Sequence, residues 1–223
     1  YGKRNAERDR DRYSLFNPVA LHEHQTRLRA MLSLWRAHGW TGLADKHIVE
    51  VGCGAGGNLL ELLRLGAQAP TLAGWELLPE RVQAARACLP SAVAAHEGDA
   101  AAAPIAPASI DAVLAFTVFS SILDDATQAR LAQAMWSWLK PGGGVLWYDF
   151  AFNNPRNADV RGVSVSRVHE LFPQGRFALR RLTLAPPIAR ALAAVHSALL
   201  TPAAVVLYPA RTHRLLWIAK ASA

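Results

Sequence analysis

Several residue types and patterns that mark particular protein classes are scarce in this sequence. Only two of its 223 residues are cysteines, too few for a disulfide framework, and this favours a reducing, cytoplasmic location. No stretch of about twenty residues is free of both charge and proline, which argues against a membrane span. No His, Cys and Asp spacing fits a zinc site, so we expect no bound metal. Fifteen Gly and thirteen Pro are ordinary numbers and exclude collagen-like and low-complexity classes.

The chain is rich in apolar residues, and its charge is unevenly placed. Its 52% hydrophobic residues are too many for a disordered chain, and 223 residues suit one domain of moderate size. Residues 1–36 hold eight Lys/Arg against four Asp/Glu, residues 37–149 six against eleven, and residues 150–223 ten against two. The basic ends lack interleaved aromatics and any DNA-binding motif, so we expect no nucleic-acid partner. They suit a phosphorylated or carboxylated substrate, or an anionic membrane surface.

Hydrophobic periodicity predicts alternating helices and strands up to residue 150. Helices are expected at 18–38, 59–65, 79–89 and 124–139. Strands are expected at 47–51, 71–75, 92–95, 111–115 and 144–150. Beyond residue 150 we expect a helix at 166–172, a strand at 177–184, a helix at 187–200 and a strand at 213–220. This order predicts one α/β domain built on a parallel sheet with helices on both faces.

The most informative segment is a glycine loop that follows the first predicted strand and opens a helix. Ligands of open α/β sheets bind at the carboxyl ends of the strands, and glycines let a ligand approach the backbone closely. Two interpretations compete. Gly52, Gly54 and Gly57 satisfy the dinucleotide pattern G-x-G-x-x-G, whereas Gly52, Gly54 and Gly56 satisfy G-x-G-x-G. The glycines alone do not decide between them.

Three acidic residues near strand ends favour the second interpretation. Glu50 precedes the first glycine by two residues, where an acid suits a cofactor with a cationic sulfonium and an amino group better than a pyrophosphate. Glu76 follows the second strand and can accept both hydroxyls of a ribose. Asp99 follows the third strand and is well placed for an adenine amino group, which no nicotinamide site predicts.

Together these features resemble the class I S-adenosylmethionine-dependent methyltransferases. The matching pattern runs in order over roughly residues 45–150: Glu-x-Gly-x-Gly-x-Gly, Glu76, Gly98-Asp99, Asp111-Ala-Val before Phe116, and Leu139-Lys-Pro-Gly-Gly. The resemblance implies a single-domain, Rossmann-like fold with a seven-stranded, mostly parallel sheet whose last strand is antiparallel. It divides residues 1–223 into an N-terminal arm and helix (1–40), a cofactor-binding core (45–150), and a substrate-side loop with C-terminal strands (151–223).

The resemblance also assigns residues to S-adenosylmethionine. The methionine end is expected at Glu50, Gly52, Gly54, Gly56 and Asn58. The ribose is expected at Glu76, and the adenine at Leu77, Asp99 and Ala100. Phe116 is expected beside the cofactor, and Tyr13 over it. Many relatives carry a His after the fourth strand where this sequence has Ser121, so any role of that His is absent here.

Candidates for catalysis and acceptor binding follow the fifth strand. Asp149 is the leading candidate for a general base that takes a hydroxyl proton, with Tyr148 beside it. The polar loop beyond them offers groups for an anionic acceptor at Asn153, Asn154, Arg156 and Arg161. Residues 147–163 look like those of small bacterial methyltransferases found with polysaccharide enzymes, which implies a small-molecule or glycan acceptor.

Alternatives remain open at the level of function and assembly. The chain could instead be an NAD-dependent oxidoreductase, which Glu50 and Asp99 disfavour, or a non-catalytic partner subunit with a cofactor fold. The apolar stretch 185–210 is interpreted first as a helix packed on the sheet or over a cleft. A dimer interface or a peripheral contact with a lipid surface is the alternative, and a monomer and a homodimer are both compatible with the sequence.

Overall fold

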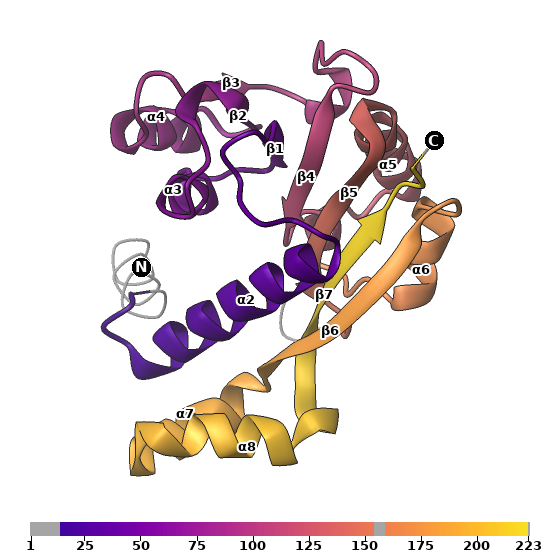
Figure 1. The fold of residues 1–223 in the computed structure, drawn as a ribbon. Helices are drawn as coiled ribbons and strands as arrows, with labels where there is room; N and C mark the ends of the chain where they lie inside the picture. The colour runs from indigo at the N-terminus through magenta and orange to yellow at the C-terminus, as the bar shows by residue number, and fades with distance from the viewer. Residues whose placement is uncertain (1–13, 154–158, 223) are drawn as a thin grey trace.

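The computed structural model describes residues 14–153 and 159–222, which build a seven-stranded sheet (Figure 1). The strands are β1 (Ile48–Val51), β2 (Leu72–Glu76), β3 (Ala94–Glu97), β4 (Ile110–Phe116), β5 (Leu139–Phe150), β6 (Arg176–Leu184) and β7 (Arg211–Ala219). Their order is β3-β2-β1-β4-β5-β7-β6, and β7 runs antiparallel to both of its neighbours. The predicted fold class, including the antiparallel last strand, is confirmed.

Helices cover both faces of this sheet. On one face, α2 (Pro18–Ala37), α3 (Gly57–Arg64) and α4 (Pro79–Cys88) share a buried cluster with alternate residues of the strands. On the other, α5 (Asp125–Trp138) and α6 (Val165–Leu171) pack against the intervening residues. The side chain of Asn17 accepts a hydrogen bond from the N–H of Val19, and Asp124 accepts one from Thr127, so the expected caps fix where α2 and α5 begin.

The topology places one ligand-binding edge at the centre of the sheet. Strand β1 lies between β2 and β4, so the chain leaves β1 in one direction and returns to its other side through β4. Such a reversal of strand order opens a crevice at the carboxyl ends of the two central strands. Strand β1 is buried along its whole length, which holds the residues after it in a fixed position.

Among the predicted elements whose limits differ from the structure, three are notable. Strand β3 runs on through His96 and Glu97, which pair with β2. Strand β5 begins at Leu139 rather than at 144, because Leu139 pairs with Ile110 ahead of a register shift. The helix expected at 187–200 is broken: α7 (Pro186–Val195) ends at an extended His196, a short 3₁₀ turn follows, and α8 (Leu200–Val206) starts anew. Within the described ranges, no helix is long and apolar enough to cross a membrane.

Candidate active site

The glycine loop after β1 adopts a backbone that only glycine adopts without strain. Gly52, Gly54 and Gly56 all have positive φ, at +65°, +54° and +83°. A Cβ atom added to Gly52 would lie 2.7 Å from Cγ2 of Val118, which follows β4. The loop is thus both left-handed and in close contact with the neighbouring strand end, and it leads directly into α3.

Glu50 is a buried carboxylate with one oxygen unused. Its side chain is 1% exposed, and its Oε1 accepts a 2.6 Å hydrogen bond from Nδ2 of Asn58. Its Oε2 has no hydrogen-bond partner among the described residues. Burial raises the pKa of Glu50 to about 7, against the Asn58 hydrogen bond and the positive charge of Arg27, which lower it. A donor that carries positive charge would satisfy this oxygen.

Glu76 connects the second strand to the glycine loop. Its Oε2 accepts a hydrogen bond of 3.0 Å from the N–H of Gly54, and its Oε1 accepts one of 3.1 Å from the N–H of Leu78. Each carboxylate oxygen can accept a further hydrogen bond, so the side chain remains able to hold a diol. Leu77, 67% exposed, lies beside it as an apolar surface.

Asp99 is half-exposed at the end of the third strand. Its Oδ1 accepts a 2.9 Å hydrogen bond from the N–H of Ala101, which caps a 3₁₀ turn over the buried Ala100. Its Oδ2 pairs with the guanidinium of Arg130 from α5 at 2.9 Å. No local pattern marks Arg130, because only the fold brings α5 to this strand end.

A row of aromatic side chains crosses three strands at the same edge. Phe116 lies beside Tyr148, with ring centroids 5.5 Å apart, and Tyr148 stacks on His213 at 5.1 Å. Arg27 of α2 covers the first two rings, at 5.6 Å and 5.4 Å. Arg27 forms no ion pair with any described residue, and it also lines a pocket with Asn58. Sequence reasoning missed Arg27 and His213, since no local pattern marks them.

The side chains of both predicted catalytic residues, Tyr148 and Asp149, form hydrogen bonds with other groups of the protein. The hydroxyl of Tyr148 hydrogen-bonds Oγ1 of Thr183 at 2.8 Å, and burial raises the Tyr148 pKa to about 12. Asp149 is fully buried, and its two oxygens accept hydrogen bonds from the backbone N–H groups of Ser120 and Phe150. Burial raises the Asp149 pKa to about 6. Asp149 therefore anchors the turn after β4, and its role as a base remains a prediction.

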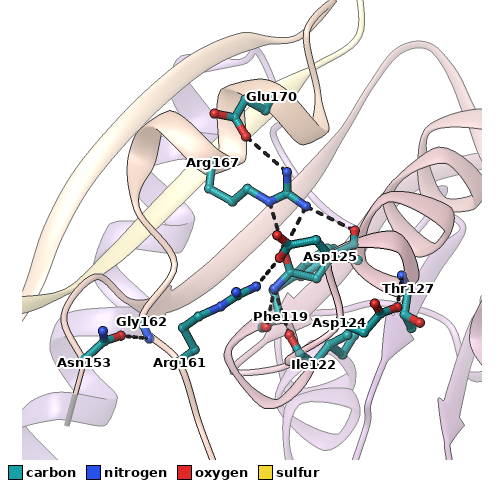
Figure 2. A network of polar contacts seen from close by, with 11 residues as sticks. Phe119, Ile122, Asp124, Asp125, Thr127, Asn153, Arg161, Gly162, Arg167 and Glu170 are labelled. Atoms are coloured by element: carbon teal, nitrogen blue, oxygen red, sulfur yellow. Dashed lines mark hydrogen bonds and ion pairs between the residues drawn. The ribbon is translucent and has the colours of Figure 1, made fainter. Parts of the chain in front are cut away.

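The predicted acceptor loop is partly described. The side chain of Asn153 accepts a hydrogen bond from the N–H of Gly162, and Arg161 forms an ion pair with Asp125, as Figure 2 shows. Arg167 of α6 reaches the same Asp125 and also Glu170 (Figure 2). The remaining candidates, Tyr13, Asn154 and Arg156, lie outside the described residues.

Solved structures share this fold over nearly the whole chain. A Thermotoga maritima protein described as a "possible histamine N-methyltransferase" superposes with a TM-score of 0.64 at 16% identity, over 96% of this chain and 95% of that one. A SAM-dependent methyltransferase from Archaeoglobus fulgidus gives 0.62 at 12% identity, over 90% and 98%. A chain of the Haloferax volcanii complex that contains the Trm112 methyltransferase activator gives 0.62 at 18% identity, over 96% of each chain.

The sequence comparisons address the family more directly. No curated protein sequence gives a significant match. Residues 48–143, which span β1 to the start of β5 and hold the glycine loop with all three acids, match a family model described as "Methyltransferase domain". This match covers the cofactor-binding core, and together with the observed fold it supports the resemblance to class I S-adenosylmethionine-dependent methyltransferases.

Proposed function

We propose that the protein transfers a methyl group from S-adenosylmethionine to a small-molecule or glycan acceptor that carries an anionic group. The observation that carries the cofactor part is the unpartnered, buried Oε2 of Glu50 beside the left-handed glycine loop. The ammonium group of the cofactor's methionyl end supplies the charged donor that this oxygen lacks. The residues present therefore fit the cofactor.

The methionyl end also carries a negative charge on its carboxylate, and this charge suits Arg27. An amino acid carries a carboxylate next to its ammonium group, and Arg27 lines the same pocket as Asn58, which holds Glu50. We propose that the guanidinium of Arg27, which forms no ion pair with a described residue, makes a bidentate contact with that carboxylate. Glu50 and Arg27 then complement the two charges of one zwitterion. Glu76 takes the ribose hydroxyls, and Leu77, Asp99 and Ala100 surround the adenine.

The chain's own contribution to methyl transfer is alignment and exclusion of water. When bound, S-adenosylmethionine supplies an already activated methyl group. Phe116 and Tyr148 form an apolar wall at the sheet edge where an acceptor would approach. For a hydroxyl acceptor we propose that His213 orients the hydroxyl by accepting its hydrogen bond: burial and the charges of Arg27 and Arg214 lower its pKa to about 4, so the imidazole is neutral at pH 7 but only a weak base. Its Nδ1 lies 3.0 Å from Oγ1 of Thr212, which leaves Nε2 for the acceptor.

The anionic acceptor is supported by the guanidinium groups around Asp125. Arg161 and Arg167 line a cavity of about 210 Å³ on the α5 face, next to the turn after β4. Their shared partner Asp125 is 63% exposed, and exposed ion pairs of this kind contribute only about 0–1 kcal/mol. A phosphate or carboxylate could therefore replace Asp125 on Arg161 at little cost.

Calorimetric titration tests the cofactor part directly. S-adenosylhomocysteine should bind with roughly micromolar affinity, about −8 kcal/mol, and NAD should not bind. Binding of NAD without any response to S-adenosylhomocysteine would contradict the proposed function. Release of S-adenosylhomocysteine can then be followed over pairs of acceptors that differ only in a phosphate or carboxylate.

Arg161→Gln tests the acceptor part. It should raise the KM of the anionic member of the best acceptor pair about tenfold, from the loss of one charge-assisted contact, and leave the neutral member unchanged. Arg176→Gln, an exposed arginine on β6, is the matched control. Equal KM values for wild type and Arg161→Gln would remove Arg161 from the acceptor site.

A further inference from the structure

The connection between β6 and β7 is unusually poor in charge. We refer to residues 185–210 as the insert; it contains α7, α8 and two 3₁₀ turns. Residues 191–210 include no Asp, Glu, Lys or Arg, although 18% of the whole chain is charged. In Figure 1 the insert lies beyond the sheet, next to the first half of α2.

The insert exposes apolar side chains where a surface helix normally carries polar ones. Six large residues are more than a third exposed: Val195, Leu199, Val205, Val206, Leu207 and Tyr208. Val195 and Val206 each reach 77%. Its inner side forms only a small buried cluster of Leu184, Ala189 and Leu200, against which Val19 of α2 packs. The fold thus buries one side of the insert and leaves an apolar face with no covering element among the described residues.

The C-terminal segment that carries this face is basic. Residues 176–223 hold seven Lys/Arg and no Asp/Glu. The guanidinium groups of Arg181 and Arg211 lie over the ring of Tyr208, at 5.5 Å and 4.8 Å, and Arg190 is exposed on α7. A two-fold dimer through this face would place each basic rim against its own copy, which costs free energy through like-charge repulsion. The charge therefore favours an anionic and apolar occupant.

We propose that the insert docks on the surface of an anionic lipid bilayer. Val195, Val205 and Val206 enter the boundary between head groups and acyl chains, Tyr208 lies at head-group level, and Arg190 contacts lipid phosphates. The insert joins the ends of β6 and β7 that lie beside the carboxyl end of β5, where Phe150 pairs with His213. Docking therefore turns the active-site edge of the sheet toward the membrane. This inference concerns attachment and does not depend on methyl transfer.

Sedimentation with vesicles tests the proposal on the full chain. Wild-type protein should bind vesicles of phosphatidylcholine with phosphatidylglycerol at least tenfold more tightly than vesicles of phosphatidylcholine alone. The double substitution Val205→Ser/Val206→Ser should weaken binding to the anionic vesicles about tenfold or more. Leu123→Ser, at an exposed apolar residue ahead of α5, is the control and should bind like wild type. Arg190→Gln should reduce the preference for anionic over neutral vesicles.

Two results would overturn the proposal. One is equal vesicle binding by the double variant and wild type, when both have the same unfolding midpoint. The other is a concentration-dependent dimer in analytical ultracentrifugation, without vesicle binding, that Val205→Ser/Val206→Ser converts to monomer; the covering surface would then be a second copy of the chain. S-adenosylhomocysteine titration of each variant reports separately on the proposed function.

Discussion

The cofactor half of the sheet, β1 to β4, and the acceptor half, β5 to β7 with the insert, are built from contacts of different range. In the cofactor half, Glu50 reaches Asn58 eight residues away, and Glu76 reaches Gly54 across 22. In the acceptor half, Tyr148 bonds Thr183 across 35 residues, and Arg27 covers Tyr148 from the far end of the chain. Charge divides in the same way, acidic over residues 37–149 and basic over 150–223. Contacts around the glycine loop leave a sequence pattern, whereas contacts between more distant elements, including that of Asp99 with Arg130, do not.

The largest difference between the two halves is expected from a substitution in the glycine loop of the cofactor half. Gly52→Ala should weaken S-adenosylhomocysteine binding about 100-fold, because a left-handed alanine costs about 1–2 kcal/mol and its Cβ also meets Val118. Gly66→Ala is the control, since Gly66 has a φ of +93° but open space around its Cα. Vesicle binding by the Gly52→Ala protein should be unchanged. A parallel loss of both activities would mean that the two halves are not separate units.

Glu50→Gln should act on stability and binding in opposite directions. The folded-state pKa of Glu50, about 7, lies above its ordinary value of 4.5, so its charged form destabilises the fold increasingly as pH rises through that range. At pH 8 the variant should therefore be more stable by up to about 3 kcal/mol, and at pH 4.5 the gain should vanish. Thermal and urea unfolding at both pH values measure this. Cofactor affinity should fall, and a variant that binds S-adenosylhomocysteine normally would argue against an ammonium partner for Glu50.

Glu76→Ala should weaken cofactor binding by about 1–3 kcal/mol, because two ribose hydroxyls and the N–H of Gly54 lose a charged acceptor. Glu97→Ala, at the exposed end of β3, is the matched control. Calorimetry on folded variants measures the difference. An unchanged dissociation constant would take Glu76 out of the site.

Arg27→Gln tests whether α2 contributes to cofactor binding, because Arg27 of α2 lines a pocket with Asn58 of α3. The affinity for S-adenosylhomocysteine should fall about tenfold, whereas that for methylthioadenosine, which has no amino-acid carboxylate, should stay the same. Arg29→Gln, two positions along α2, controls for the lost charge. Equal losses for both ligands would indicate that Arg27 only supports the rings of Phe116 and Tyr148.

Most of the cofactor half could be predicted from the sequence, and little of the acceptor half could. Glu50 lies near the end of β1, Glu76 ends β2 and Asp99 comes two residues after β3, so the strand order alone puts them at one edge. His213 becomes part of the site only through its register with Phe150 on an antiparallel strand, and Asp149 is held by a turn whose backbone no motif specifies. The break at His196 was missed because the stretch 187–200 is apolar apart from Arg190, His196 and Ser197 and carries no proline or glycine at the break.

The two residues that flank the insert are partners in the sheet. Leu184 of β6 pairs with Arg211 of β7, so the insert leaves and re-enters the sheet at a single pair of facing residues. A segment held in this way can be shortened, lengthened or exchanged without changing the order or register of any strand. Evolution, or a protein engineer, can therefore alter the surface that this segment presents while the glycine loop and its acidic residues stay as they are. A graft of the insert onto a related sheet would carry its surface properties with it.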